Sequence, residues 1–255
     1  MNKSKQQIRN DIIIKCKNLL NNSSSDICDH QNIKHLTNVG DNKNYSNKKN
    51  LDDSLNIDIS YNFANSLSDQ LYSLIEQLFA TKFIDKVQQR STVNIAVYNA
   101  ITWEIKLNLF ILKIFNDTYY NKLIKFYYPV AYKTNKTLKF IEYLPEHLTN
   151  PPPIFYCDSI NNNIFKLQKI ISCYNLDLMI TPLIATDSSG VRLGRGGGYY
   201  DTTINNLLQT QKPILCGVGY DCQFLSTLIP ADSWDISLDF FVSNTKIIKF
   251  NNTLT

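Results

Sequence analysis

The sequence predicts a single α/β domain of three layers, α/β/α, with a largely parallel central sheet. Short apolar runs typical of strands alternate with helical patterns, which is the arrangement of βαβ units. The chain has 255 residues, enough for one large core. Its hydrophobic fraction of 44% supplies the apolar side chains for that core and excludes a wholly disordered chain.

The chain divides into three parts by its residue pattern. Residues 4–20 carry apolar residues near helical spacing, so 1–20 is expected to hold the N-terminal helix of the domain. Residues 21–60 are rich in Asn, Ser, Asp and Lys, and we expect a flexible insertion there. Residues 61–250 are expected to form the remainder of the single domain.

Helices and strands alternate through this remainder. Further helices are expected over about 65–80, 104–115, 164–173 and 199–209. Strands are expected at 93–98, 123–128, 138–143, 176–181, 214–220 and 238–242. Two of these strands are expected to stop at the prolines that follow them, Pro129 and Pro182, and Pro151–Pro153 is expected to form a stiff connector.

Charge and cysteine content narrow the class of protein. The net charge of +4 is modest and does not require a nucleic-acid partner. The six cysteines include no C-x-x-C pair, and we interpret them as free thiols in a reducing compartment. No apolar run is long enough to span a membrane, and no secretory signal is recognisable. We therefore expect a cytoplasmic protein without a nucleic-acid or membrane partner. We also expect it to be a monomer.

A glycine-rich window stands out against a strong compositional bias. Asn and Ile each occur 30 times, whereas the chain has only 8 Gly and 4 Arg. Five of those glycines and two of those arginines lie within residues 190–198. A chain that has otherwise few Gly and Arg residues has kept them in one short segment, which indicates that this segment is constrained.

The position of the window suggests an anion site. It follows an expected buried strand and precedes an expected helix, the edge at which α/β sheets bind ligands. Glycines leave backbone N–H groups uncovered, and Arg192 and Arg195 add forked donors suited to phosphate or carboxylate. Asp201 could hold a divalent cation beside the phosphates.

The common phosphate motifs do not fit this window. A dinucleotide fingerprint would need Gly where Tyr199 stands, and a P-loop would need Lys after Gly198. A structural turn and an RNA-binding Arg-Gly-Gly segment are the remaining alternatives. A plain turn does not need two arginines, and Arg-Gly-Gly tails are repeated and disordered.

The segment Arg-Leu-Gly-Arg-Gly-Gly-Gly-Tyr-Tyr-Asp at 192–201 resembles the signature of the 5-formyltetrahydrofolate cyclo-ligase family. Further matches occur in the expected order, and the resemblance covers about 4–20 and 90–245. They are Lys5 and Arg9, 95–98, Glu104-Ile105, Leu176-Asp177-Leu178, Pro182, Asp187, Gly190, 217–220, Gln223, Pro230 and Trp234-Asp235. The chain departs from the family at Trp103, where Gly is usual, at Thr186, where Phe is usual, and in the length of 21–60.

The resemblance implies a reaction and a set of residue roles. The family uses ATP and Mg²⁺ to convert 5-formyltetrahydrofolate into 5,10-methenyltetrahydrofolate, releasing ADP and phosphate. ATP would be bound by Lys5, Arg9, Arg192, Leu193, Gly194, Arg195, Gly196, Gly197, Gly198, Tyr199 and Tyr200, with Arg192 and Arg195 as catalytic residues. The folate would be bound by Asn99, Glu104, Arg195, Gly196, Gly197, Gly198 and Tyr199, and Mg²⁺ by Asp201 and Asp235.

Alternative interpretations remain at this stage. The chain could be a non-catalytic folate- or nucleotide-binding protein of the same fold. Asp235 could be a cap or turn residue, and Glu104 a first-turn helix residue favoured by the helix dipole. Tyr199 and Tyr200 could be core aromatics instead of ligand contacts.

Overall fold

The computed structural model describes residues 3–22, 50–101, 103–148, 156–157, 170–208 and 212–251. Its α-helices are α1 (Lys5–Asn22), α2 (Asn50–Thr81), α3 (Ile84–Gln88), α4 (Asn108–Asn116) and α5 (Tyr199–Asn205). Short 3₁₀ turns are η1 (Tyr120–Lys122), η2 (Pro145–Leu148), η4 (Cys173–Asn175) and η6 (Asp221–Gln223).

The strands form one large and one small sheet. The large sheet contains β1 (Val93–Ala96), β2 (Ile124–Tyr132), β3 (Thr137–Tyr143), β4 (Tyr156–Cys157), β5 (Ile170–Ile171), β6 (Leu178–Pro182), β9 (Ile214–Val218), β11 (Phe240–Val242) and β12 (Ile247–Lys249). The small sheet contains β7 (Ala185–Asp187), β8 (Arg192–Leu193) and β10 (Phe224–Leu225).

The large sheet is parallel at its centre, as the sequence predicts. Its strand order is β12-β11-β9-β6-β1-β2-β3-β5, with β4 beside β2. All pairs from β11 through β2 are parallel, while β12 at one edge and β3 and β5 at the other pair antiparallel. The carboxyl ends of β1, β6 and β9 therefore meet at one edge of the sheet.

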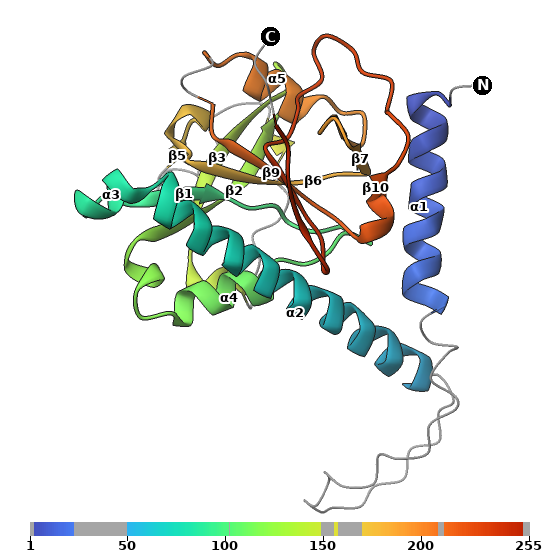
Figure 1. Ribbon diagram of the computed structural model, residues 1–255, viewed down its shortest axis with the longest axis horizontal. Coiled ribbons are helices and arrows are strands. Elements are labelled where there is room, and N and C mark those ends of the chain that lie inside the picture. Colours follow the sequence, from blue (N-terminus) through green and yellow to red (C-terminus); the bar gives the residue numbers. More distant parts are fainter. Residues whose placement is uncertain are drawn as a thin grey trace, which may run out of the picture.

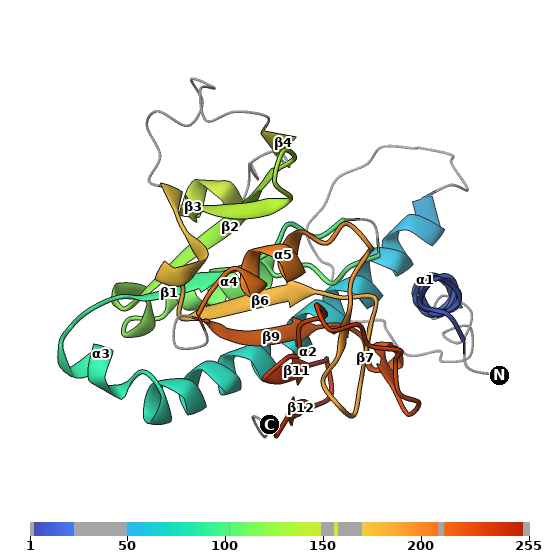
Figure 2. The same ribbon diagram turned by 90° about the horizontal axis from the view of Figure 1, so that it is seen from above.

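Alternate side chains of the central strands point into two different hydrophobic clusters. Ile95 and Ile180 belong to the larger cluster, which includes the buried residues of α2 and α4, whereas Ala96 and Met179 belong to the second cluster. Ile204 of α5 lies in that second cluster. Figures 1 and 2 show α5 on one side of the sheet and α2 and α4 on the other. This arrangement confirms the expected three layers.

Helix α2 begins earlier than the sequence analysis predicts. It starts at Asn50, so residues 50–60, expected to belong to the flexible insertion, are helical. Apolar residues at 51, 55 and 59 recur at four-residue spacing, a helical signal that the many polar residues around them obscured. Residues 23–49 of the predicted insertion and the prolines at 151–153 lie outside the described residues.

One prediction about the sheet was wrong in detail. Strand β2 does not stop at Pro129 but continues to Tyr132, with Pro129 opposite Phe140 of β3. The ladder between β1 and β2 ends at Ala96 and Tyr127, before Pro129. Proline has no N–H to donate, but no residue of β1 pairs with it.

The helix predicted over 164–173 is also wrong at its described end. Ile170 and Ile171 form β5, which pairs antiparallel with Phe140 and Ile141 of β3. β-branched residues fit a pleated surface well, and here pairing with an existing strand outweighs the local helical pattern.

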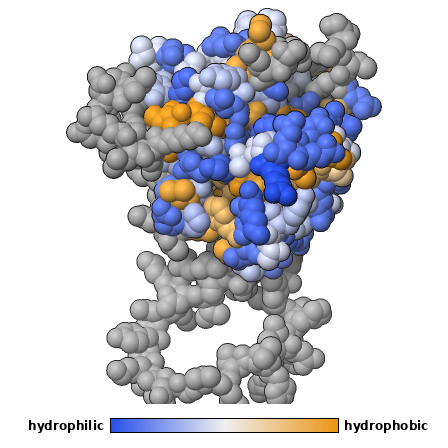
Figure 3. Space-filling view, turned by 90° about the vertical axis from the view of Figure 1, so that its left-hand side faces the viewer, coloured by the Kyte–Doolittle hydropathy of each residue, from blue (hydrophilic) through white to orange (hydrophobic). Residues whose placement is uncertain are grey.

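Figure 3 shows the face that lies on the left in Figure 1. Hydrophilic residues cover most of what is drawn in colour there, and apolar residues occur in small separate groups. Within the described ranges, none of the helices has both the length and the hydropathy needed to cross a membrane.

A buried glutamine ties the edge of the large sheet to the segment that leads into the small one. The Gln223 side chain is 2% exposed. Its Nε2 donates to the backbone oxygens of Leu183, at 2.7 Å, and Ile184, at 3.1 Å. Its Oε1 accepts from the Tyr220 N–H at 2.7 Å. One amide therefore satisfies three backbone groups that have little access to water.

We expect Gln223→Met to lower the free energy of unfolding by about 3 kcal/mol, because it leaves these backbone groups without partners. Urea unfolding followed by circular dichroism would measure the change. Gln77→Met, at an exposed position of α2, is the matched control and should stay within about 0.5 kcal/mol of the wild type. Equal stabilities of the two variants would contradict the assigned role of Gln223.

Candidate active site

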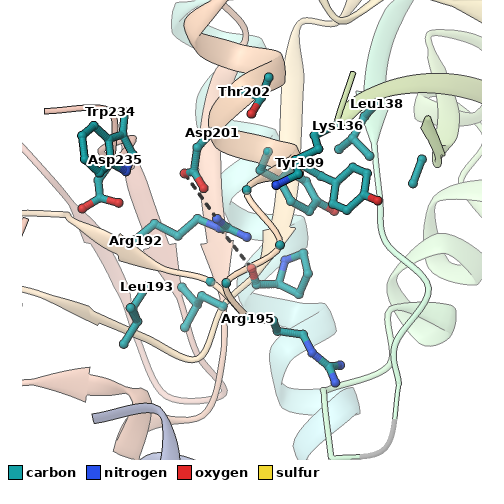
Figure 4. Close-up of a pocket in the computed structure, with 18 of the residues that line it drawn as sticks. Lys136, Leu138, Arg192, Leu193, Arg195, Tyr199, Asp201, Thr202, Trp234 and Asp235 are labelled. Carbon is teal, nitrogen blue, oxygen red and sulfur yellow. Dashed lines mark hydrogen bonds and ion pairs between the residues drawn. The ribbon is translucent and has the colours of Figure 1, made fainter. Parts of the chain in front are cut away.

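A cavity of about 890 Å³ opens beside the carboxyl ends of β1 and β6. Its walls come from α1, the β2–β3 hairpin, the segments after β1 and β6, the glycine-rich loop, α5, and the segment at 232–235. Figure 4 shows side chains from several of these elements around it. The volume lies in the upper part of the range typical of small-molecule sites.

The glycine-rich loop does not follow β6 directly, as the sequence analysis expected. The antiparallel pair β7 and β8 intervenes, and the loop at 194–198 then leads into α5. Gly196 and Gly198 have φ values of +93° and +75°, a region that other residues rarely adopt. Helix α5 has only seven residues, so the backbone of the loop contributes more to the site than the helix dipole.

Arg192 lies at the base of the cavity with its side chain 5% exposed. Its Nε donates to the Pro182 carbonyl at 3.1 Å, and its Nη1 lies 3.8 Å from Oδ1 of Asp201. The guanidinium also sits 4.7 Å from the ring centre of Tyr200. Burial lowers the pKa of Arg192, and the charge of Asp201 opposes that shift.

Gly194 allows this guanidinium to lie against the loop. A Cβ atom at position 194 would come within 2.9 Å of Nη1 and 3.0 Å of Nη2 of Arg192. The position therefore requires a residue without a side chain, because the arginine has little room to move in its buried setting.

Helix α1 contributes two cations, Lys5 and Arg9, to the lining of the cavity. The Lys5 Nζ contacts Oδ2 of Asp232 at 2.6 Å and forms a second, shorter hydrogen bond to Asp235. Arg9 donates from Nε to the Gly194 carbonyl at 2.9 Å. Burial alone would lower the pKa of Lys5, but the two carboxylates raise it above its ordinary value. Lys5 is therefore charged at neutral pH.

Glu104 lies deep in the cavity and Arg195 near its mouth. The Glu104 side chain is 6% exposed and that of Arg195 is 53% exposed, with 3.7 Å between Nη1 and Oε1. The Ile101 N–H donates to Oε2 of Glu104 at 3.0 Å. Burial raises the pKa of Glu104 in spite of this hydrogen bond and the nearby arginine. Glu104 precedes α4, so it is not a first-turn helix residue.

Asp201 and Asp235, predicted as metal ligands, both line the cavity. Oδ1 of Asp201 is buried and has no hydrogen-bond partner, which suits an atom that binds a cation. Oδ2 of Asp235 accepts from Lys5 and from the Asp232 N–H. In the described part of the chain, no group of three or more metal-ligating side chains occurs. Two carboxylates nevertheless fit Mg²⁺, which usually keeps several waters and binds substrate phosphates.

Tyr199 and Tyr200 lie between the core and the cavity. They are partly buried, pack against the second hydrophobic cluster and also line the cavity. Trp103, which stands where the resembled family has Gly, is 6% exposed and packs in the larger cluster. Its indole therefore fills core volume beside Glu104.

The structure brings together all but one of the predicted site residues. The exception is Asn99, which follows β1 but does not line the cavity, although Ile101 does. The sequence analysis missed Asp232, whose only signal is its position three residues before Asp235. It also missed Lys136 on the β2–β3 turn, and it named Trp234 at the cavity edge as a family match without giving it a role in the site.

The fold and the cavity define an α/β protein with a basic, glycine-rich site suited to an anionic small molecule. A sequence model of the 5-formyltetrahydrofolate cyclo-ligase family matches residues 64–244. The chain is 32% identical to the 5-formyltetrahydrofolate cyclo-ligase of Haemophilus influenzae over 164 residues, covering 64% of this chain and 82% of that protein. The chain belongs to the 5-formyltetrahydrofolate cyclo-ligase family.

A second relative and a solved structure are also similar to this chain. The 5-formyltetrahydrofolate cyclo-ligase of Escherichia coli K12 is 41% identical over 81 residues, which cover 32% of this chain and 43% of that protein. A 5,10-methenyltetrahydrofolate synthetase structure from Mycoplasma pneumoniae superposes with a TM-score of 0.56 at 18% identity. It covers 95% of this chain and 99% of the other, and it shows that the fold is shared.

We expect Glu104→Gln to stabilise the protein at pH 8 more than at pH 5. The raised pKa of Glu104 means that the folded chain holds this proton more tightly than the unfolded chain, so ionisation lowers stability as pH rises through that pKa. Glutamine has the same shape and removes the buried charge, and its amide oxygen can still accept from Ile101. Thermal unfolding at both pH values would measure the difference.

The control for this experiment is Glu76→Gln, at an exposed position of α2. Its effect on Tm should be small and nearly independent of pH. A Glu104→Gln variant that is less stable than the wild type at pH 8 would contradict the inference that burial of the ionised carboxylate lowers stability.

Proposed function

We propose that this chain catalyses the ATP-dependent conversion of 5-formyltetrahydrofolate into 5,10-methenyltetrahydrofolate, with release of ADP and phosphate. The observation that carries the proposal is the position of the family signature. Residues 192–201 form one side of the cavity, and the charged residues predicted to act with them line the same space. The expectations of a cytoplasmic location and a monomeric state remain predictions.

The triphosphate would lie along the glycine-rich loop. Gly196 and Gly198 have positive φ and carry no side chain of their own over the backbone of the loop. Lys5 and Arg9 lie one turn apart on α1 and line the same cavity as this loop. Arg195, largely exposed in the absence of a ligand, can turn towards a bound phosphate.

The folate would occupy the part of the cavity next to Glu104. A pterin ring has several N–H donors, and a carboxylate in a water-poor setting is a strong acceptor for them. Apolar walls from Ile101, Pro129 and Leu138 lie in the same cavity and suit the flat faces of a ring.

The proposed reaction has two steps. The formyl oxygen attacks the γ-phosphorus of ATP, an O–P bond forms, and the bond from phosphorus to ADP breaks. The folate N10 then attacks the activated formyl carbon, the C–O bond to phosphate breaks, and N10 loses its proton to solvent. The enzyme needs no nucleophile of its own and acts by positioning the substrates and neutralising charge.

Asp201 and Asp235 would hold Mg²⁺ next to the phosphates. When bound, this ion neutralises part of the triphosphate charge and orients its oxygens. The chain's own contribution is to keep Oδ1 of Asp201 at the cavity wall. The guanidinium of Arg192, within ion-pair distance, helps to hold the carboxylate there. Lys5 similarly fixes Asp235.

A direct assay tests the proposal. Purified protein is mixed with 5-formyltetrahydrofolate, ATP and Mg²⁺, and the absorbance of 5,10-methenyltetrahydrofolate is followed. We expect turnover that requires all three components. Folate binding by calorimetry without any turnover would instead support a non-catalytic binding protein of the same fold.

We expect Asp201→Asn to lower the rate by at least about 10²-fold with the fold intact, because a neutral amide is a poor ligand for a hard cation. The rate would be measured as a function of Mg²⁺ concentration. Asp69→Asn, at an exposed site on α2, is the matched control and should behave like the wild type. An unchanged Mg²⁺ dependence in Asp201→Asn would remove this residue from the metal site.

We expect Arg195→Lys to reduce kcat by roughly 10²-fold, or about 2.7 kcal/mol, with a smaller effect on ATP binding. Lysine keeps the charge but loses the forked geometry that matches a phosphate. Steady-state kinetics with ATP varied at saturating folate separate the two effects. Arg90→Lys, at an exposed position outside the cavity, is the control. A wild-type kcat with only a raised KM for ATP would assign Arg195 to ground-state binding.

A further inference from the structure

Two cysteines outside the candidate active site face each other between distant parts of the chain. Cys16 lies on α1 and Cys222 in η6, 206 residues later, and their sulfur atoms are 3.7 Å apart. Cys16 has no exposed surface, whereas Cys222 is partly exposed. A reagent in solution can therefore reach Cys222, and Cys16 is placed behind it.

The two thiols differ in chemical character. The hydrogen bond from Cys16 lowers the pKa of Cys222, and the charge of Lys15 acts in the same direction, against the effects of burial and of Asp221. The same hydrogen bond, together with burial, raises the pKa of Cys16. This division is the one expected of a reactive thiol and a second thiol that resolves its adduct.

The other cysteines whose side chains are described lack this arrangement. Cys173 and Cys216 are buried and free, and burial raises the pKa of both thiols. Neither has another cysteine sulfur as a contact among the described residues. Their thiols are the kind that behaves as small apolar side chains.

We propose that Cys16 and Cys222 are a redox-active pair. A low-molecular-weight disulfide oxidises them, and they then form a reversible disulfide with each other. The Cys222 thiolate attacks one sulfur of the small disulfide, forming a mixed disulfide and releasing one small thiolate. Cys16 then loses its proton and attacks the Cys222 sulfur, which expels the second small thiol. Two protein thiols are oxidised, one small disulfide is reduced, and the two protons end on the two released thiols.

The link would fasten the helix that supplies two cations to the cavity. Cys16 follows Arg9 by seven residues, about two helical turns, so both face the body of the protein. The buried side chains of this helix, among the described residues, are Ile8, Ile12 and Cys16. The helix therefore packs on the rest of the protein through non-covalent contacts. A disulfide would close a loop of more than 200 residues and hold α1 in the position seen here.

The test treats the full chain with glutathione disulfide and maps its cysteines by mass spectrometry under non-reducing conditions. We expect a peptide that joins Cys16 to Cys222, and a Tm that is higher by about 5 °C or more and returns to its starting value on reduction. Two free thiols after treatment, a link from Cys222 to a different cysteine, or an unchanged Tm in the linked protein would each overturn the proposal.

Three variants separate the roles of the two sulfurs. Cys16→Ser should accumulate a glutathione adduct on Cys222, because the hydroxyl can still donate a hydrogen bond to Cys222 but cannot resolve the adduct. Cys222→Ser should leave Cys16 reduced, and Cys173→Ser, the matched control, should form the link like the wild type. A glutathione adduct on Cys16 in Cys222→Ser would contradict the assignment of Cys222 as the reactive thiol.

Discussion

The buried guanidinium of Arg192 is the interaction on which the geometry of the cavity depends. It hydrogen-bonds to the end of β6 through Pro182, faces Asp201 on α5 and lies over the ring of Tyr200. Gly194 leaves space for it in the following loop. A buried charge needs several partners to offset its desolvation, and these partners lie on β6, before the glycine-rich loop, and on α5, after it. The charge thus fixes the loop in space.

The charges around the cavity are paired with one another. Lys5 contacts Asp232 and Asp235, and Arg195 lies within ion-pair distance of Glu104. The ion pairs of Lys5 join α1, at the start of the chain, to the segment at 232–235. The position of α1 therefore depends on residues that line the same cavity. A ligand that carries both phosphates and a hydrogen-bonding ring can take the place of one partner in some of these pairs. The charged side chains are already partly removed from water, so binding such a ligand costs less desolvation.

Much of the fold could be predicted from the sequence, because the central strands are buried on both faces and read as short apolar runs. The strand that ends at Pro182 and the helix that starts at Tyr199 were both predicted, and these two elements place the glycine-rich window at the site. The pair β7 and β8 between them was not predicted, because two- and three-residue strands carry too little pattern to detect. The contact between Lys5 and Asp232 depends on tertiary structure across 227 residues, and local spacing could not show it.

The polarity of the cavity changes from base to mouth, and this change limits how a substrate can lie in it. Glu104 is almost fully buried and burial raises its pKa, so a triphosphate placed against it would disfavour the ionised carboxylate still further. The mouth, with Arg195 and the open glycine backbone, has the opposite character. A neutral ring rich in N–H groups fits the buried end, and an anion fits the exposed end. The two substrates of the proposed reaction differ in this same way, so in the proposed reaction the folate ring would take the buried end and the triphosphate the exposed end.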